Sequence, residues 1–366
     1  MTTVHRIHNF AAGPATLPLP VLEQIQRNLI ALPGIGMSVL EISHRSKTFE
    51  SICDQAEADM RTLADIPQHY RILFLQGGAS LQFSMVPMNL LSEGATADYI
   101  DCGRWADKAV ADAKKVGRVA VAASTKDEHY VRLPRQAEMR LSFSPAYVHM
   151  TSNNTIEGTQ YKTLPDVGPA PLVSDASSDL FSRPFEMSRH ALVYAGAQKN
   201  MGPAGVTVVI IRDDMIERSR EKKTALPAVL NYAVHAENRS LYNTPPVFAV
   251  YVLGLVMKWL MAQGGLAAMA SVNERKAAKL YAEIDRTGFY RGAAATPDRS
   301  LMNVTFRLAT EELEKLFIAE TTAAGLDGLK GHRVAGGMRA SIYNAFPENG
   351  VEALVSFMKD FECRHG

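Results

Sequence analysis

Residues 191–211 read ALVYAGAQKNMGPAGVTVVII and place Lys199 in a turn with Gly and Pro between two apolar runs. The runs 192–195 and 206–211 predict buried strands, because short apolar segments bounded by turn residues are typical of sheet interiors. A lysine between buried strands has two readings. It is either a loop lysine at a surface strand end, or a lysine in a dry site that favours the neutral, nucleophilic amine.

The same alternation of short apolar runs with amphipathic segments continues on both sides of this stretch. One amphipathic segment, 105–116, has an apolar stripe and stops at Gly117, as a helix would. Strands that alternate with helices predict an α/β fold with a mainly parallel sheet and helices on both faces. The expected strands are 72–75, 119–122, 147–150, 172–173, 192–195 and 206–211.

The pattern changes after about residue 265 and predicts a smaller α/β domain there. Ser271 and Glu274 form a capping box, which predicts a helix that runs from there to Gly288. Apolar and polar residues then alternate with a period of two, which is typical of strands with one solvated face. The further elements expected are a strand at 302–308, a helix at 311–323, a strand at 338–343 and a helix from Asn349.

A carboxylate, Asp175, follows the apolar run 171–173. The carboxyl end of a parallel strand faces the crevice in which α/β sheets bind ligands. Taken alone, Asp175 reads as the cap of the next helix. On a strand end beside Lys199, it is suited to hold the proton of a pyridinium nitrogen while the lysine holds an aldehyde carbon. Pyridoxal phosphate needs both groups.

The segment RILFLQGGASLQF (71–83) is a strand that enters the turn Gly77, Gly78, Ala79 and Ser80 and continues as a helix. Small residues let backbone N–H groups approach an anion, and a helix N-terminus adds favourable partial charge. The segment lacks the GK[ST] of a P-loop and the GxGxxG of a dinucleotide site. It therefore predicts a site for one phosphate.

An aromatic residue, Trp105, closes the segment DCGRW (101–105) at the start of an expected helix. An indole at this edge of the sheet either stacks on a cofactor ring or is a half-buried core residue.

Cationic side chains at separate places in the chain form the last set of candidates. A guanidinium fork binds two oxygens at once, and Arg339 lies on the polar face of its expected strand. Each cation alone reads as a solvated charge, whereas together they predict a site for substrate anions. They are His44, Arg45, His332, Arg333 and Arg339.

Composition limits the class of protein. The chain has 366 residues, 47% of them apolar and 21% charged, with a net charge of +1, which predicts two globular domains and no nucleic-acid partner. Three scattered cysteines fit neither a disulfide framework nor a metal site. The longest apolar run, 247–257, is about half of the ~20 residues of a bilayer span. We therefore expect a cytoplasmic protein that has no membrane partner and holds no metal.

Together these segments resemble the phosphoserine aminotransferase family, a class V group of fold-type I pyridoxal-phosphate enzymes. The resemblance runs almost end to end. The motifs that carry it are NFAAGPATLP (9–18), EISHRS (41–46), LFLQGGASLQF (73–83), VSDASSDLFSRP (173–184), YAGAQKNMGPAG (194–205), YNTPP (242–246) and GHRVAGGMRASIYNA (331–345). It implies a large domain at 16–264 with a seven-stranded type of sheet, and a small domain formed by 1–15 and 265–366.

The resemblance also implies roles in binding the cofactor. Lys199 would bind pyridoxal 5'-phosphate covalently and later shuttle the substrate proton, and Asp175 would pair with the pyridine nitrogen. Trp105 would stack on the ring, and Thr155, in SNNTIEG, would contact its polar edge. The residues implied for the phosphate are Ala79, Ser80 and Gln198, with Asn243 and Thr244 from the other subunit of a homodimer with shared active sites.

The implied reaction is reversible amino transfer between phosphoserine and 2-oxoglutarate, which gives 3-phosphohydroxypyruvate and glutamate in serine biosynthesis. The phosphorylated four-carbon precursor of vitamin B6 is a further substrate known in this family. Arg339 would hold the α-carboxylate. The phosphate of phosphoserine, or the side-chain carboxylate of glutamate, would meet His44, Arg45, His332 and Arg333.

The chain departs from the family pattern at two places. Ala11 stands where some members have a serine in NFSAGP, so a side-chain hydrogen bond is lost there. Ala79 and Ser80 replace the Gly–Arg of some members, which leaves backbone donors but no guanidinium for the phosphate.

Two other functions remain open from the sequence. A pyridoxal-phosphate lyase or cysteine desulfurase would use the same Lys199 and Asp175. A desulfurase also needs a nucleophilic thiol on a mobile loop, for which Cys53, Cys102 and Cys363 offer no obvious candidate. The other alternative is a binding protein for phosphorylated metabolites, which would need no chromophore.

Overall fold

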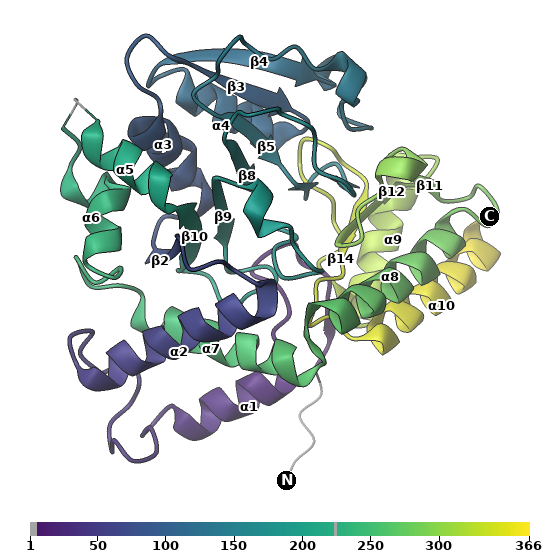
Figure 1. The fold of residues 1–366 in the computed structure, drawn as a ribbon. Helices are drawn as coiled ribbons and strands as arrows, with labels where there is room; N and C mark the ends of the chain where they lie inside the picture. Colours follow the sequence, from purple (N-terminus) through teal and green to yellow (C-terminus); the bar gives the residue numbers. More distant parts are fainter. Residues whose placement is uncertain (1–5, 223–224) are drawn as a thin grey trace.

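The computed structural model describes residues 6–222 and 225–366 and has alternating strands and helices (Figure 1). The helices are α1 (Leu19–Asn28), α2 (Lys47–Ala64), α3 (Gly78–Leu90), α4 (Arg104–Ala113), α5 (Asp213–Glu221), α6 (Tyr232–Glu237), α7 (Val247–Ala262), α8 (Gly265–Ile284), α9 (Glu311–Ala323) and α10 (Glu348–His365). The longer strands are β2 (Tyr70–Leu75), β3 (Thr96–Asp101), β4 (Arg118–Ser124), β5 (Val148–Thr151), β8 (Leu172–Asp175), β9 (Leu192–Gly196), β10 (Thr207–Arg212), β12 (Asn303–Arg307) and β14 (Met338–Ser341). Two-residue strands are β1 (His8–Asn9), β6 (Asn153–Asn154), β7 (Thr159–Gln160), β11 (Arg291–Gly292) and β13 (Leu326–Asp327).

The central sheet has seven strands in the order β2-β10-β9-β8-β5-β3-β4. The pairs from β9 to β4 are parallel, and β10 runs antiparallel to both β2 and β9. In the register, Asp175 lies opposite Thr151 on one side and opposite Tyr194 on the other. The mainly parallel sheet is confirmed, and it brings the carboxyl ends of β5, β8 and β9 to one edge.

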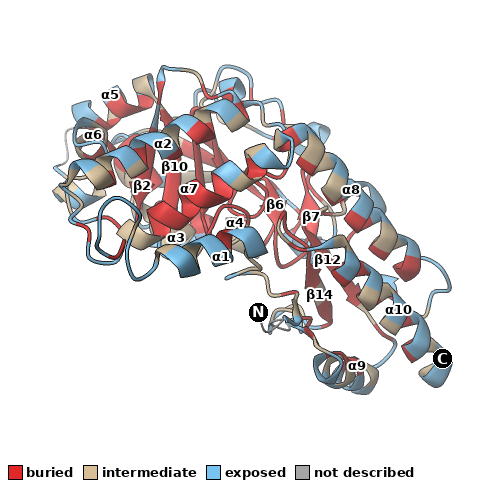
Figure 2. Cartoon of the chain, turned by 90° about the horizontal axis from the view of Figure 1, so that it is seen from below, coloured by how far each residue is buried: buried red, intermediate tan, exposed pale blue. Residues whose placement is uncertain are grey.

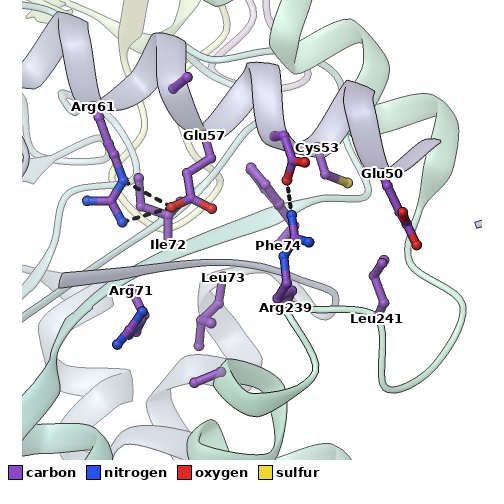
Figure 3. A pocket seen from close by; sticks show the side chains of 13 residues that line it. Glu50, Cys53, Glu57, Arg61, Arg71, Ile72, Leu73, Phe74, Arg239 and Leu241 are labelled. Atoms are coloured by element: carbon purple, nitrogen blue, oxygen red, sulfur yellow. Dashed lines mark hydrogen bonds and ion pairs between the residues drawn. The ribbon is translucent and has the colours of Figure 1, made fainter. Parts of the chain in front are cut away.

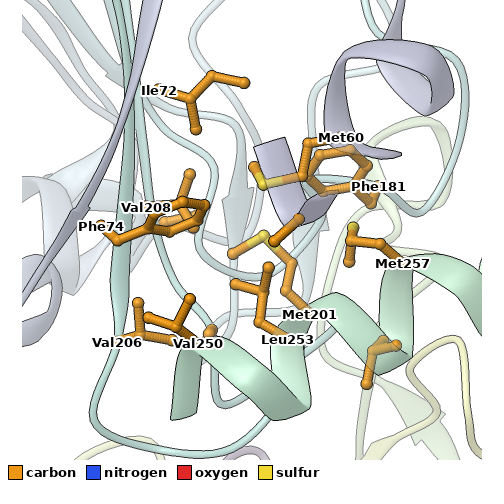
Figure 4. Packing of buried hydrophobic residues seen from close by; sticks show 14 of the residues in the cluster. Met60, Ile72, Phe74, Phe181, Met201, Val206, Val208, Val250, Leu253 and Met257 are labelled. Atoms are coloured by element: carbon orange, nitrogen blue, oxygen red, sulfur yellow. The ribbon is translucent and has the colours of Figure 1, made fainter. Parts of the chain in front are cut away.

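Helices cover both faces of this sheet, because successive strand residues point to opposite sides. On one face, Ile72 and Phe74 pack with Val208 against Met60 of α2 and Leu253 of α7 (Figure 4). The alternate residues of β2 and β10 lie on the other face of the sheet. The helices that contribute to the core on that face are α3, α4, α5 and α6.

The C-terminal part of the chain has its own apolar cluster around the antiparallel sheet β11-β12-β14. Helices α8, α9 and α10 supply most of its other members, and Phe10 joins it from the N-terminal segment because β1 pairs with β13. Figure 2 shows that β12 and β14 are mostly buried, whereas α8 and α10 turn exposed residues outward. The C-terminal elements therefore share one apolar cluster, and the N-terminal segment packs into it.

One expected helix start is wrong. Helix α8 begins at Gly265, and Ser271 lies inside it with its hydroxyl 3.3 Å from the carbonyl oxygen of Ala267. The break from α7 falls at Gly264, whose φ of +92° favours glycine. The helix starts there because its buried face already begins at Leu266.

Within the described ranges, no single helix is long and apolar enough to cross a membrane. The consecutive helices α7 and α8 pass that test only as a pair, with a bend of 83° between them. The apolar run in α7 is explained by packing, since it supplies much of one core cluster.

Candidate active site

Lys199 lies in the turn between β9 and β10, at the edge where β5 and β8 end. Its Nζ donates a hydrogen bond of 2.7 Å to Oγ1 of Thr155, which lies in the β6–β7 hairpin. The Nη1 of Arg339 donates to the backbone oxygen of the same Thr155 at 3.3 Å. One threonine therefore joins the lysine of the central sheet to the arginine of the C-terminal sheet.

Burial changes the chemistry of Lys199. It lowers the pKa of the amine from 10.5 to about 8, an effect that Asp175 opposes with its negative charge and Arg339 reinforces with its positive charge. A large neutral fraction is thus present near pH 8, and only the neutral amine attacks an aldehyde.

We expect the rate at which the cofactor-free protein takes up pyridoxal phosphate to rise with pH and level off above about pH 8. Stopped-flow absorption measures this profile. Asp175→Asn removes the charge that raises the lysine pKa, so its midpoint should move to lower pH. An unchanged midpoint in Asp175→Asn would contradict the electrostatic coupling of the two groups.

Asp175 is the last residue of β8 and is 4% exposed. Burial raises its pKa, and a hydrogen bond from the Ser177 backbone N–H to Oδ1, 3.0 Å long, opposes that shift. The expected role as the cap of a next helix is wrong, because residues 176–186 form turns and irregular backbone, and Asp175 instead closes a local turn. The other oxygen, Oδ2, accepts no hydrogen bond from the described part of the chain, so it is free for a ligand.

The Gly–Gly turn opens α3 as the sequence predicts. Gly77 and Gly78 have φ angles of +87° and +64°, and a Cβ on Gly77 would lie 2.6 Å from the side chain of Leu81. Among the described side chains none caps this helix. The first-turn N–H groups around Ala79 and Ser80 are consequently available to an anion.

Trp105 lies in the first turn of α4 and belongs to the same apolar cluster as Ala79. Its ring centroid is 6.4 Å from that of Phe83, and the Nζ of Lys108 lies 4.3 Å from the indole centroid. The indole is half-buried, as a core residue at this position would be, and its stacking on a cofactor ring stays a prediction.

Arg339 lies on β14 beside a cavity of about 350 Å³ that Arg104 and Glu157 also line. Its Nε is buried without a partner among the residues that the structure covers. His332 and Arg333 lie in the loop before β14. Burial and then the charge of Arg339 lower the pKa of His332, with smaller contributions from Lys108, Arg333 and Arg104. The region is therefore strongly cationic, as an anion site requires.

The remaining predicted residues differ in how they relate to this cluster within one chain. His44 and Arg45 lie in the turn before α2, and in the described ranges no hydrogen bond or ion pair links them to Lys199. Thr244 accepts a hydrogen bond of 3.0 Å at its backbone oxygen from Gln76, which precedes the α3 turn. Gln198 accepts one of 2.9 Å at its backbone oxygen from Ala15.

A cavity of about 380 Å³ lies elsewhere, between α2 and the edge strand β2 (Figure 3). Its walls carry charges that pair with one another, such as Glu57 with Arg61 and Asp54 with Arg239. Cys53 is at its wall, and burial raises the pKa of that thiol to about 12. These groups are poorly suited to catalysis, and the cavity does not include Lys199.

Sequence reasoning missed three residues of the site: Arg104, Lys108 and Glu157. The sequence carries a signal for Arg104 and Lys108. Residues four apart on a helix share a face, and these two residues lie on either side of Trp105 in the sequence. No local signal indicates Glu157, since its partner Arg104 is distant in the sequence.

The site fits pyridoxal phosphate on the chemistry of its donors. It combines a lysine of lowered pKa, a carboxylate with a free oxygen, uncapped helix N–H groups and an indole at the same sheet edge. Lys199, Asp175, the α3 N-terminus and Trp105 would hold the aldehyde carbon, ring nitrogen, phosphate and ring face, respectively.

Comparisons with known proteins agree with this chemistry. The family described as aminotransferase class V matches residues 7–354. Phosphoserine aminotransferase of Herpetosiphon aurantiacus is 53% identical over 98% of this chain and 99% of its own length. Phosphoserine aminotransferase of Geobacillus kaustophilus is also 53% identical, again over 98% of this chain and 99% of its own length. The solved phosphoserine aminotransferase of Bacillus circulans subsp. alkalophilus has a TM-score of 0.96, with 49% identity and 99% coverage of both chains. A pyridoxal-phosphate-bound phosphoserine aminotransferase from Trichomonas vaginalis has a TM-score of 0.93, with 39% identity over 97% of this chain and all of its own.

Proposed function

The chain belongs to the aminotransferase class V family, and on that premise we propose that it transfers an amino group reversibly between phosphoserine and 2-oxoglutarate. The products are 3-phosphohydroxypyruvate and glutamate, which places the reaction in serine biosynthesis. The observation that carries the amino-transfer chemistry is Lys199, bonded to Thr155 at 2.7 Å, beside the buried Asp175 at a neighbouring strand end. The choice of substrate follows from the relatives named phosphoserine aminotransferase. The phosphorylated four-carbon precursor of vitamin B6 also has two anionic ends and is a second candidate substrate.

Lys199 and Asp175 have the chemical roles in this proposal. Bound pyridoxal phosphate supplies an aldehyde for covalent attachment and a ring that accepts electrons from the substrate carbon. Lys199 would hold the aldehyde carbon of the bound cofactor, and its Nζ, when free, would take the proton from the substrate α-carbon. Thr155 Oγ1 orients that amine by the hydrogen bond it accepts from Nζ. Asp175 would hold a proton on the ring nitrogen.

Cationic side chains bind the two substrate anions. Arg339 binds the α-carboxylate that phosphoserine and glutamate share, and its unpaired Nε supplies a donor. His332 and Arg333 bind the phosphate or the distal carboxylate, and His44 and Arg45 join them from the second subunit. Backbone and side-chain donors for the cofactor phosphate come from Ala79, Ser80 and Gln198, and from the partner's copies of Asn243 and Thr244.

We expect Arg339→Ala to raise KM for phosphoserine and glutamate alike, by about 10- to 150-fold, the cost of one lost charged hydrogen bond. Arg333→Ala should raise KM for phosphoserine more than KM for glutamate, because a dianion depends more on clustered cations. Steady-state kinetics with each donor measures both ratios. Equal effects of both substitutions on both substrates would refute this division of roles.

We propose that the active enzyme is a homodimer. The segment 29–40 leaves large apolar side chains exposed, with Ile30 88% and Leu40 62% accessible. Such a patch beside His44 and Arg45 is typical of a protein–protein interface, and a second copy that covered it would carry those cations into a partner's site.

Ile30→Asp combined with Leu40→Asp is therefore expected to give a monomer that is folded but inactive. Sedimentation velocity measures the mass, and circular dichroism measures the fold. The exposed Val121 lies on the opposite edge strand β4, so Val121→Asp serves as the control that stays dimeric. A dimeric double variant would exclude segment 29–40 from the interface.

We further propose that residues 16–264 form a large domain and that residues 1–15 and 265–366 form a small one. Phe10 packs with the C-terminal cluster rather than with the clusters of the central sheet, which supports this division. We also propose that the protein is cytoplasmic, where serine is made.

The test of the function is product analysis with purified protein. Phosphoserine and 2-oxoglutarate should give equal amounts of glutamate and 3-phosphohydroxypyruvate. A desulfurase would instead release sulfur from cysteine and lose activity on thiol alkylation. Burial raises the pKa of both Cys53 and Cys102 to about 12, which argues against a reactive thiol at either position.

A further inference from the structure

Helix α4, which carries Trp105, has no cap of its own. The residue at its N-cap, Gly103, has no side chain, and its φ of 175° is extended. The first N–H groups of a helix need partners, and a side chain at the N-cap normally supplies one. The partner for this helix comes from a different part of the chain.

Glu157, in the turn between β6 and β7, supplies that partner. Its Oε1 accepts hydrogen bonds from the backbone N–H of Arg104 at 3.1 Å and from Nη1 of the same residue at 3.0 Å. The side chain of Glu157 is only 3% exposed. A Cβ on Gly103 would clash with Oδ1 of Asn154 and lie 3.0 Å from Oε2 of Glu157, so glycine permits the close approach of this turn.

The same β6–β7 turn also contacts Lys199. Thr155 accepts the hydrogen bond from Lys199 and also bonds to Arg339, and the turn is closed by a 2.8 Å bond from Gly158 N–H to the backbone oxygen of Asn154. A further bond of 2.9 Å joins Oγ1 of Thr305, in β12, to the backbone oxygen of Glu157. A single short turn thus connects the lysine, the α-carboxylate arginine and the helix of the indole.

We infer that Glu157 is a positioning residue for the amino transfer: it caps α4 from the β6–β7 turn and so fixes Trp105 relative to Lys199. The inference rests on the proposed function. Lys108 constrains the indole on another side, because its amine lies 4.3 Å from the ring centroid. Without the Glu157 contact, the first turn of α4 loses its partner and the indole gains freedom to move.

The experiment compares Glu157→Ala and Glu157→Gln with a matched control, Asp298→Ala. Asp298 is also a buried carboxylate that accepts a backbone N–H, from Leu133 at 3.0 Å, and pairs with an arginine, Arg135. Its side chain holds the segment around Leu133 and makes none of the contacts with Arg104, Thr155 or Lys199. Loss of stability alone would therefore affect both alanine variants.

One readout needs no cofactor. In a Trp259→Phe background the fluorescence reports Trp105 alone, since the chain has two tryptophans. We expect Glu157→Ala to shift the emission to longer wavelength and to increase quenching by acrylamide, whereas Asp298→Ala leaves both unchanged. The amide oxygen of Glu157→Gln still accepts the Arg104 N–H, so this variant should resemble the parent.

The second readout is kinetic. A misplaced ring should lower kcat in Glu157→Ala by about 10- to 100-fold with little change in KM for phosphoserine, because small errors in position cost this much. Glu157→Gln should restore most of kcat. If Glu157→Ala does not fold, Glu157→Asp replaces it, because its shorter side chain keeps the charge but does not reach Arg104 N–H.

Unchanged Trp105 emission and kcat in a folded Glu157→Ala or Glu157→Asp variant would overturn the inference, as would equal changes in Asp298→Ala. Failure of the proposed function is a separate result, because the parent protein itself would then show no amino transfer from phosphoserine. The fluorescence arm would still decide whether Glu157 fixes the indole.

Discussion

Replacing Lys199 with alanine is expected to lower kcat for amino transfer from phosphoserine by about 10⁴-fold, the upper end of the range for a lost proton-transfer group. The structure explains why this amine is special: burial lowers its pKa to about 8, and Thr155 and Asp175 act on it from neighbouring elements. The variant should also lose covalent attachment of pyridoxal phosphate, so that dialysis removes the cofactor. Single-turnover absorption and product assays measure the two effects.

Lys162 provides the control for this prediction. Its pKa is also lowered to about 8, by burial of the amine and by the charge of Arg183, although much of the side chain is exposed. Its Nζ donates to the backbone oxygen of Arg299 and lies outside the site. Lys162→Ala should therefore keep kcat near that of the parent. Comparable losses of kcat in the two variants would contradict a catalytic role that depends on the position of Lys199.

Asp175→Asn is expected to lower kcat by about 10²–10³-fold, the typical cost of removing one preorganised electrostatic partner. The substitution keeps the shape of the side chain, and its Oδ1 still accepts the Ser177 N–H, so folding is preserved. What it removes is the negative charge that favours a protonated ring nitrogen. The measurements are kcat with phosphoserine and the dissociation constant for pyridoxal phosphate.

Asp101 is the matched carboxylate for Asp175. It ends β3 in the same sheet, is 4% exposed, and accepts hydrogen bonds from Ser124 and Tyr130. Burial raises its pKa as it does that of Asp175. Asp101→Asn should reduce stability with little effect on kcat. A larger loss of kcat in Asp101→Asn than in Asp175→Asn would contradict the assignment of Asp175.

The apolar pattern predicted the strands around Lys199 because those strands are apolar throughout and bounded by turn residues. It did not place β3 among the expected strands, because this strand carries buried polar residues. Asp98, for example, is fully buried, and its carboxylate accepts hydrogen bonds from the backbone and the hydroxyl of Ser142. These hydrogen bonds come from a loop that is distant in sequence, and the periodicity of one segment carries no information about that loop.

The candidate site shows the same difference between features with a local sequence signal and features that depend on distant segments. Lys199, Asp175 and the Gly77–Gly78 turn could be predicted because each lies at a strand end that the local pattern identifies. The family resemblance implied that Thr155 contacts the cofactor, but the hydrogen bond from Lys199 to Thr155 was not predicted. Glu157 could not be predicted at all, because its role depends on a partner that the folding of the sheet brings to it.

We propose that Lys199 holds pyridoxal phosphate and that phosphoserine donates its amino group there. The absorption spectrum of the purified protein, recorded before and after phosphoserine is added without 2-oxoglutarate, tests both statements. We expect a visible band from the lysine-bound cofactor, which phosphoserine converts to the spectrum of the aminated cofactor, with one 3-phosphohydroxypyruvate formed per site. A protein that stays colourless after incubation with pyridoxal phosphate would contradict the role of Lys199, and a coloured protein that does not respond to phosphoserine would contradict the substrate.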